Sequence, residues 1–329
     1  MRFEWDWLQP VMPVPYVPTL GPVHPDALAA GLFSDVLDVA GTGRFLPYDK
    51  DQRWADRKDE TVLPNGIVHT RHQTLIPTWS QRGAGSFTVY VYGPDPDGQA
   101  AETVAKLAAD HGAGRARVVT FHGPDTTPPP GTAHTRVQLR VFGRPSPADQ
   151  PGPVRPVDGL PGPARATFAG FADRLTDDGF AFLHRQMQAG AVGPVLAVTD
   201  GGRVVGAIGP METMTDSTGA SRLLPQYFGV LPEHRGHGYG RTLWRAAMHW
   251  GTTHGAAYQL LQTETGGASD RLCQAEGLRS LGFVQTVPRS AWSRAPLCSA
   301  APVPLFRLVS GRVCGRRGGG GRGSRAGRW

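Results

Sequence analysis

Cysteine is scarce in this sequence, and several other features are missing. Only three cysteines occur in 329 residues, Cys273, Cys298 and Cys314, which are too few and too scattered for a disulfide framework or a zinc site. No run approaches the ~18 apolar residues of a membrane helix. The first residues, MRFEWDWLQP, lack the apolar segment of a secretory signal. We therefore expect no metal, no membrane partner and a location in the reducing cytoplasm.

Acidic residues and lysine are absent from the last part of the chain. Residues 307–329 contain seven arginines, which equal the whole formal net charge of +7, so the rest of the chain is neutral overall. In composition this tail resembles RGG-type RNA-binding segments, which bind nucleic acid without regard to sequence. The alternative, which we favour, is a disordered extension without a selected role. Nucleic acid is thus expected as a partner only through the tail.

The distribution of proline and glycine divides the sequence into four parts. Residues 1–143 predict an N-terminal α/β domain of unassigned role, and residues 144–153 a Pro/Gly-rich linker. We expect residues 154–293 to form a second domain. We expect residues 294–329 to form a disordered Arg/Gly-rich tail. In the first domain we expect a helix over 26–40 capped by Asp26, strands over 86–93, 115–121 and 135–143, and a helix over 99–112.

The second domain shows a definite order of elements. A short strand over 154–157 and helical segments within 164–189 come first. A hairpin over 194–209 then turns at Asp200-Gly201-Gly202, and a strand over 223–230 leads into a glycine-rich loop. A helix to about residue 254, a strand over 258–262, a helix over 270–281 and a strand over 283–287 complete the domain.

The glycine-rich stretch LPEHRGHGYGRTLW, residues 231–244, carries the strongest chemical signal. A loop between a strand and a helix offers unpaired N–H groups and a partial positive charge to an anion. Glycines let the backbone approach a phosphate closely, and Arg235 and Arg241 add charge. An ordinary glycine-rich turn is the plain alternative, because such motifs are weak on their own. The spacing fits neither a P-loop, which needs Lys-Ser or Lys-Thr, nor a Rossmann turn, which needs a parallel βαβ unit.

The same stretch resembles the acetyl-CoA loop of the GCN5-related N-acetyltransferases (GNAT). The family signature Q/R-x-x-G-x-G/A is filled by Arg235, Gly238 and Gly240, and the flanking V-x-P (Val230–Pro232) and LGF (Leu281–Phe283) also fit. The resemblance covers about residues 154–293. It implies a mixed α/β (α+β) fold, with a mostly antiparallel central sheet flanked by helices. It also implies an acyltransferase that uses acetyl-CoA as co-substrate and a small-molecule or protein amine as acceptor.

The resemblance also assigns cofactor-binding residues. The pantetheine arm would lie between two diverging strands and pair with the backbone of Phe228, Gly229 and Val230. The pyrophosphate would sit on the N–H groups of the loop, which comprises Arg235, Gly236, His237, Gly238, Tyr239, Gly240 and Arg241. The amine then attacks the thioester directly, and the enzyme supplies a base, an acid and donors for the oxyanion.

The catalytic side chains depart from the family pattern. The tyrosine acid of the family is replaced by Leu278 in one alignment and by Cys273 in another, and a thiol can protonate a thiolate. The strand before the loop holds Gln226 and Tyr227 in place of a carboxylate. Candidate bases are therefore Glu212, Glu264 and His234, with water relayed by backbone groups as the alternative. Tyr227 is a further catalytic candidate without an assigned role.

The first domain leaves two interpretations open. It repeats the order strand, loop, helix, strand and could be a degenerate GNAT-like copy, or it could be an unrelated α/β cap. Its loop carries Asp95 and Asp97, which would repel a phosphate. We expect this domain to shape the acceptor pocket or a homodimer surface. Two other functions remain open for the whole chain: a non-catalytic acyl-CoA-binding or sensor protein, and an RNA-associated protein that acts through its tail.

Overall fold

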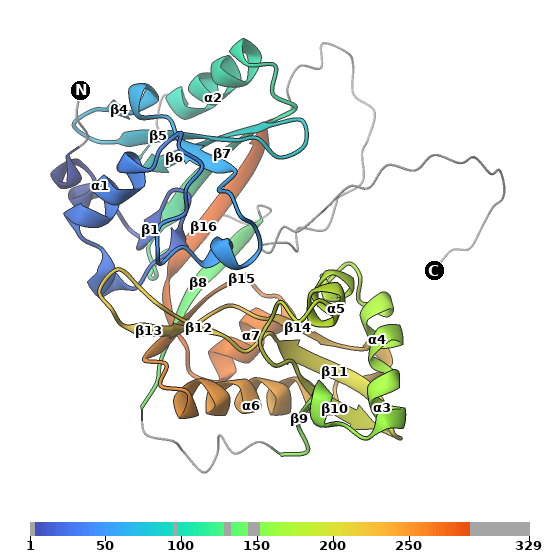
Figure 1. Ribbon diagram of the computed structural model, residues 1–329. Helices are drawn as coiled ribbons and strands as arrows, with labels where there is room; N and C mark the ends of the chain where they lie inside the picture. Colours follow the sequence, from blue (N-terminus) through green and yellow to red (C-terminus); the bar gives the residue numbers. More distant parts are fainter. Residues whose placement is uncertain (1–3, 95–97, 128–132, 144–151, 290–329) are drawn as a thin grey trace, which may run out of the picture.

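The computed structural model describes residues 4–94, 98–127, 133–143 and 152–289. These residues form sheets of ten, four and two strands with helices around them, and the ten-stranded sheet runs through both halves of the molecule (Figure 1). All strand pairings are antiparallel except two, β6 with β7 and β13 with β15. The fold is therefore the mixed, mostly antiparallel α/β arrangement that the sequence predicts.

The N-terminal half holds the first eight strands. Its strands are β1 (Tyr16–Val17), β2 (Gly21–Pro22), β3 (Glu60–Val62), β4 (Val68–His69), β5 (Thr74–Ser80), β6 (Ser86–Tyr92), β7 (Arg115–His122) and β8 (His134–Val141), and its helices are α1 (Ala30–Asp38) and α2 (Gln99–Asp110). The predicted strands and the second helix are confirmed to within two residues. The predicted cap is wrong, because Asp26 lies in a separate 3-10 turn, Pro25–Ala27, and the N-cap of α1 is Ala29. Strand β5 was not predicted, because Pro77 interrupts its apolar pattern.

The C-terminal half follows the predicted order. Its strands are β9 (Arg155–Pro156), β10 (Leu196–Asp200), β11 (Arg203–Gly209), β12 (Thr213–Thr215), β13 (Ser221–Leu223), β14 (Tyr227–Val230), β15 (Tyr258–Glu264) and β16 (Arg279–Arg289). Its helices are α3 (Gly162–Ala166), α4 (Phe168–Arg174), α5 (Phe180–Gln188), α6 (Tyr239–Thr253) and α7 (Ala268–Ala275). Helix α7 ends earlier than predicted, because Gly277 has φ 78° and β16 begins two residues later.

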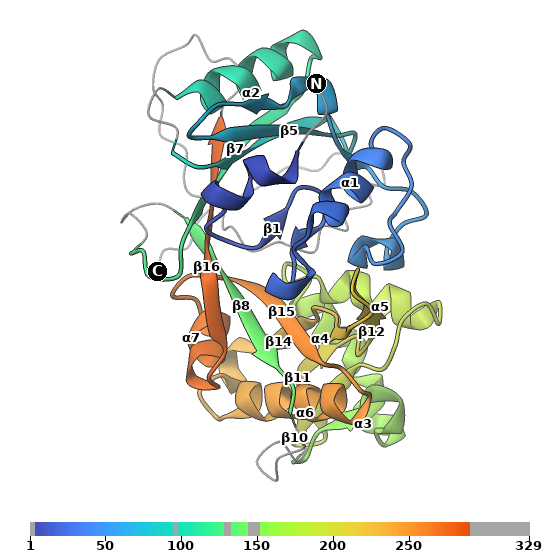
Figure 2. The same ribbon diagram turned by 90° about the vertical axis from the view of Figure 1, so that its left-hand side faces the viewer.

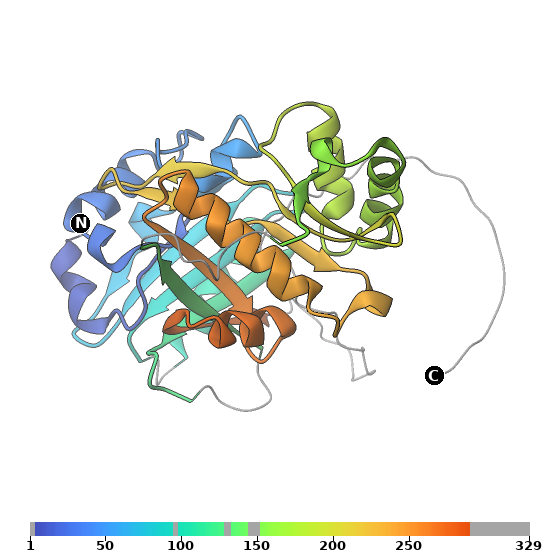
Figure 3. The same cartoon turned by 90° about the horizontal axis from the view of Figure 1, so that it is seen from below.

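Alternating side chains of β10 and β11 hold helices on both faces of the four-stranded sheet. Val198 and Ile208 pack in one core with α6, whereas Ala197 and Ala207 pack in another core with α3, α4 and α5. Seen from below, α6 lies across the sheet with α7 beside it (Figure 3). This alternation follows because successive side chains of a strand point to opposite faces of the sheet. The packing of α6 on one face of the sheet places the start of this helix near the end of β14.

The two halves exchange strands at the centre of the ten-stranded sheet. The order β7-β16-β8-β15 places β16 of the C-terminal half beside β7, and β8 of the N-terminal half beside β15. Residue Val284 of β16, for example, lies opposite Phe121 of β7 on one side and Thr135 of β8 on the other. Strands β16 and β8 cross the middle of the molecule between the two halves (Figure 2). Each half is thus completed by a strand of the other.

The N-terminal half repeats part of the topology of the C-terminal half. In the first half β6 leads through α2 to the parallel strand β7, and in the second half β13 and β14 lead through α6 to β15, which is parallel to β13. Both helices begin after a glycine in the left-handed region, Gly98 with φ 67° and Gly238 with φ 84°. This repetition fits a GNAT-like N-terminal domain better than an unrelated cap. Asp95 and Asp97, most of the linker and the whole tail lie outside the described residues, so the domain boundaries stay predictions.

A buried polar network joins the exchanged strand β8 to α7. Asp270 is 3% exposed and accepts hydrogen bonds from Arg136 Nε at 2.9 Å, Gln138 Nε2 at 3.2 Å, Thr263 Oγ1 at 3.2 Å and the N–H of Gly266 at 2.9 Å. Removal of this carboxylate leaves Arg136 Nε and the N–H of Gly266 without their acceptor, whereas Gln138 Nε2 keeps a second acceptor in Thr263 Oγ1 at 2.7 Å.

We expect Asp270→Ala to lower the free energy of unfolding by about 3 kcal/mol, the usual cost of removing one partner of a buried ion pair. Urea denaturation of the two proteins measures this difference. Glu233→Ala provides a control, because that carboxylate pairs with Arg174 at the surface, where both side chains are about half exposed. An equal effect of the two substitutions would contradict the importance of the network.

Candidate cofactor and active site

The strand that leads into the glycine-rich loop is broken in the middle. Its first part, β13, pairs with β15 at Arg222↔Tyr258 and Leu223↔Gln259, and its second part, β14, pairs with β11. Between them lies Pro225, which has no N–H to donate to a neighbouring strand. The chain therefore leaves β15 after Leu223, and β14 and β15 diverge from this point. The predicted continuous strand over 223–230 is wrong in this respect.

The backbone of β14 offers polar groups on the side that faces away from β11. The N–H of Leu231 donates to the carbonyl of Val205 at 2.9 Å, which makes this a hydrogen-bonded pair of the antiparallel ladder. Because such pairs alternate with non-bonded ones, the N–H and C=O groups of Phe228 and Val230 point away from β11. The carbonyl of Val230 accepts a hydrogen bond from Arg235 Nε at 3.1 Å. Of the predicted cofactor residues of β14, Phe228 and Val230 thus present backbone groups at the divergence of the two strands, whereas the backbone groups of Gly229 point toward β11.

Successive N–H groups at the start of α6 have no acceptor within the described part of the chain. The N–H of Arg235 still donates to Pro232 at 3.2 Å, and the first helical bond runs from Thr242 to Gly238 at 3.1 Å. Between them, the N–H groups of residues 236–241 make no hydrogen bond to a described residue. No side chain caps the helix. An anion of several oxygens can therefore bind at this helix start.

Two glycines give the loop its shape. Gly236 and Gly238 have φ angles of 83° and 84°, which residues with a Cβ rarely adopt, and a Cβ at either position would meet no atom within 4 Å. The glycines are therefore required by the backbone conformation and not by a neighbouring protein group. The space beside the Cα atoms of both glycines is open.

The charges beside the loop are largely paired. Arg241 Nε lies 3.0 Å from Glu276 Oε1, and Arg245 Nε lies 3.1 Å from Glu276 Oε2. His234 Nδ1 lies 3.4 Å from Asp200 Oδ2. The sequence predicts Arg235 and Arg241 as fixed positive charges. In the structure, Arg235 bonds the carbonyl of Val230 at the end of β14, and Arg241 pairs with Glu276, the residue that follows α7. The backbone N–H groups are consequently the main donors of the loop.

Glu212, a candidate base, is engaged in an ion pair with the N-terminal half. Its Oε2 lies 3.2 Å from Arg53 Nη1, and its Oε1 accepts the N–H of Gly193 at 2.9 Å. Arg53 also donates to the carbonyl of Pro225 at 2.8 Å, at the strand break. Burial lowers the pKa of Arg53, and the charge of Glu212 opposes this shift. Arg53 thus links Glu212 to the point where β14 and β15 diverge, but both oxygens of the Glu212 carboxylate already have partners.

Tyr227, another candidate, stands at the first position of β14 in an aromatic group. Its ring centroid lies 6.1 Å from that of Trp54 and 6.3 Å from that of Phe182, and the residue is 6% exposed. Trp54 comes from the N-terminal half and follows a 3-10 turn over Lys50–Arg53. The sequence analysis did not connect Trp54 with this site, because the contact spans more than a hundred residues. The first domain therefore contributes to the surroundings of the strand break.

The other two catalytic candidates, Glu264 and Cys273, lie on opposite faces of β15. Glu264 ends the strand opposite Thr135 of β8, on the same face as Tyr258 and Leu260 of the N-terminal core. Cys273 is 2% exposed in α7 and packs in the core that contains α6, together with Leu278. The structure does not bring these side chains together. Neither is favoured as a catalytic group by its surroundings.

Burial, and to a lesser extent the charge of Asp270, raises the pKa of the Cys273 thiol to about 12. In the unfolded chain the thiol titrates near its ordinary pKa of ~8.5, so its ionisation removes stability as the pH rises above that value. At pH 8 we expect iodoacetamide to label Cys273 slowly in the native protein and rapidly in guanidinium, as measured by mass spectrometry after replacement of Cys298 and Cys314 by serine. Rapid native labelling would show a thiol that reaches solvent and would revive its role as acid.

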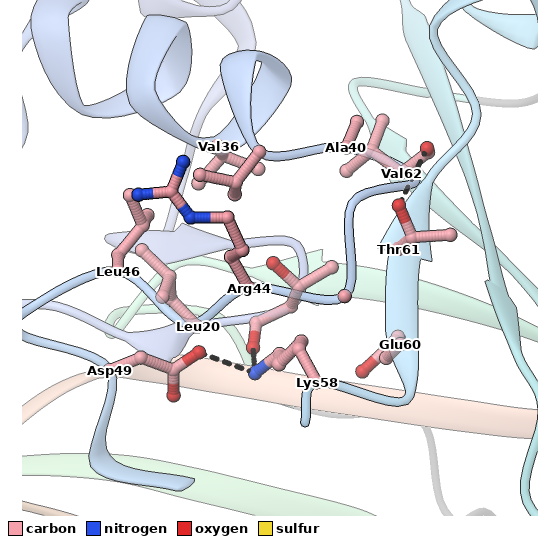
Figure 4. A pocket seen from close by; sticks show the side chains of 13 residues that line it. Leu20, Val36, Ala40, Arg44, Leu46, Asp49, Lys58, Glu60, Thr61 and Val62 are labelled. Atoms are coloured by element: carbon pink, nitrogen blue, oxygen red, sulfur yellow. Dashed lines mark hydrogen bonds and ion pairs between the residues drawn. The ribbon is translucent and has the colours of Figure 1, made fainter. Parts of the chain in front are cut away.

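One pocket lies away from these residues, in the N-terminal half. It encloses about 330 Å³, including space open to solvent, and contains none of the predicted site residues. Lys58 Nζ lies in it, 2.7 Å from Asp49 Oδ2 and 2.6 Å from the carbonyl of Thr19, below the apolar side chains of Leu20 and Val36 (Figure 4). Because these charged groups bind one another, we assign them a structural role.

Two further properties concern the described residues only. None of their helices is long and apolar enough to cross a membrane. They also contain no group of histidine, cysteine and acidic residues that could hold a metal ion.

Residues 165–274 match the model of the acetyltransferase (GNAT) family. Three solved structures with a similar chain path are a GCN5-related N-acetyltransferase from Sphaerobacter thermophilus (14% identity, 80% of this chain and 95% of that chain, TM-score 0.44), a tandem GNAT protein from the clavulanic acid biosynthesis pathway (13%, 80% and 95%, 0.43) and a GCN5-related N-acetyltransferase from Kribbella flavida (14%, 68% and 88%, 0.37).

No match to a curated protein is found. The family match spans α4 to α7, and so contains both the strand break and the loop with the unpaired N–H groups. Residues 165–274 of this chain are therefore similar to the acetyltransferase (GNAT) family.

Proposed function

We propose that the chain is an N-acetyltransferase that transfers the acetyl group of acetyl-CoA to a primary amine. The observation that carries this proposal is the series of N–H groups over residues 236–241, which have no acceptor in the described chain. A diphosphate has the charge and the oxygens to accept these N–H groups, and the family match covers the loop. The divergence of β14 from β15 provides backbone donors and acceptors beyond it, at Phe228 and Val230.

In this proposal the amine attacks the thioester carbonyl directly. The nitrogen forms the new C–N bond, the thiolate leaves with the electrons of the C–S bond, and the ammonium proton must be removed. An N–H group of β14 that points away from β11 can stabilise the oxyanion. Because Glu212 is already bound by Arg53 and Gly193, we propose that water takes the proton and that Glu212 orients the site.

Calorimetry with acetyl-CoA, followed by a thiol-release assay with a panel of amines, tests this function. Binding and amine-dependent thiol release are expected. No binding at millimolar acetyl-CoA would overturn the proposal. The acceptor, small molecule or protein, is identified by the amine that gives release, and gel filtration tests the predicted homodimer.

A second candidate is a non-catalytic acyl-CoA-binding protein. It is favoured by the burial of Cys273 and by the pairing of Glu212, which leave none of these predicted side chains free at the strand break. Binding of acetyl-CoA without thiol release for any amine would support it. An RNA-associated role rests on the tail alone, and removal of residues 307–329 should abolish RNA retention if that role exists.

A further inference from the structure

A chain of side-chain amides bridges the two strands at the point where they diverge. Gln226 Nε2 donates to the carbonyl of Leu224, and Gln226 Oε1 accepts a hydrogen bond from Gln259 Nε2 at 2.8 Å. Gln259 is 0% exposed and stands opposite Leu223, at the last paired position of β13 and β15. Its Oε1 is buried and has no hydrogen-bond partner among the described residues.

The direction of this chain of amides is determined by its first member. The carbonyl of Leu224 can only accept, so it requires the NH₂ group of Gln226. The oxygen of Gln226 then faces Gln259 and requires its NH₂ group in turn. Gln259 Oε1 is therefore presented as an acceptor.

A buried acceptor without a donor is costly. Leaving such a group unpaired costs about 1–3 kcal/mol, and an apolar side chain of similar size would avoid this cost. Gln259 is the last residue of β15 that pairs with β13 before β14 and β15 diverge, and the proposed function puts the thioester arm and the acceptor amine at this divergence. Both of these molecules carry N–H groups.

We propose that Gln259 is a positioning residue whose Oε1 accepts a hydrogen bond from a ligand N–H between β14 and β15. This inference rests on the proposed function and deepens it. The donor is an amide N–H of the acetyl-CoA arm or the N–H of the acceptor amine. Gln226 acts through Gln259, because it keeps the oxygen turned toward the ligand.

The test compares Gln259→Met with the wild-type protein. Methionine keeps the length of the side chain and removes the acceptor, so a ligand N–H is left unpaired on binding. Three quantities are measured: the Kd of acetyl-CoA, the Kd of ADP, and the KM of the amine in the thiol-release assay. ADP carries the diphosphate without the amide arm, and its Kd should change less than about twofold, since the loop donors are unaltered.

Gln73→Met is the matched control. Gln73 is 8% exposed in the N-terminal half, donates through Nε2 to Gln99 Oε1 at 3.0 Å, and also has a buried Oε1 without a partner in the described chain. It should reproduce any effect on thermal stability without changing ligand affinity. Gln226→Met frees the Gln259 amide to turn and should give a smaller loss than Gln259→Met.

A rise of about tenfold or more in the Kd of acetyl-CoA identifies an amide N–H of acetyl-CoA as the hydrogen-bond donor to Gln259. A similar rise that is confined to the KM of the amine identifies the N–H of the acceptor amine as the donor. Unchanged values of both constants in a folded Gln259→Met protein that still binds ADP would overturn the inference. Failure of the wild-type protein to bind acetyl-CoA is a distinct result, since it would remove the proposed function itself.

Discussion

Gly238→Asp is expected to abolish acetyl-CoA binding while leaving the protein folded. Gly238 is the N-cap of α6 with φ 84°, and the added side chain would meet no protein atom within 4 Å. The new carboxylate would compete for the N–H groups of residues 239–241 and repel the diphosphate, by roughly 4 kcal/mol for two charges at 4 Å near a surface. We therefore expect an affinity loss of at least about 100-fold by calorimetry, with about 1–2 kcal/mol of lost stability from the left-handed backbone.

Gly98→Asp separates these two effects. Gly98 is the N-cap of α2, has φ 67°, and likewise has no atom within 4 Å of an added Cβ. The control should lose similar stability and keep its affinity for acetyl-CoA. If Gly238→Asp bound acetyl-CoA as tightly as the wild type, the diphosphate could not lie on the start of α6.

A fragment that begins at residue 152 is expected not to fold by itself. It would contain the whole family match but would lack β8, which pairs with β15 from Tyr258↔Val141 to Glu264↔Thr135 and also with β16. Strand β15 would lose its neighbour β8, strand β16 would lose both of its neighbours, β7 and β8, and Asp270 would lose Arg136 and Gln138. Circular dichroism should show no cooperative thermal transition, because unpaired strand edges and buried polar groups remain.

Co-expression with residues 1–143 should restore folding and co-purification, since that fragment supplies β8 and accepts β16 beside β7. Cleavage of the intact protein between residues 144 and 151 should likewise leave the halves together. A 152–329 fragment that melts cooperatively and binds acetyl-CoA would contradict the dependence of one half on the other.

The glycine-rich loop illustrates what can be predicted from the sequence. Strand, loop and helix are consecutive, so the glycines, the start of α6 and the orientation of its N–H groups depend on local backbone preferences. The hairpin β10–β11 and the helices of the C-terminal half follow for the same reason, from periodicity and turn residues. The break at Pro225 could have been anticipated, because proline disrupts a paired strand.

The side chains around the strand break illustrate the opposite case. Glu212 meets Arg53, and Tyr227 meets Trp54, across more than 150 residues. Cys273 lies in the core and not at a reacting centre, because the packing of α7 against α6 turns it inward. Gln259 was not singled out in the sequence, since an orphaned amide oxygen is visible only when its neighbours are known.

The sequence by itself determined the order of the elements, the glycine-rich loop ahead of α6 and the resemblance to an acetyltransferase family, because each depends on residues that are neighbours in the chain. The tertiary structure decided the exchange of β8 and β16, the partners of the charged side chains and the acceptor at Gln259. These depend on pairings between distant segments, whose register and burial no local pattern specifies.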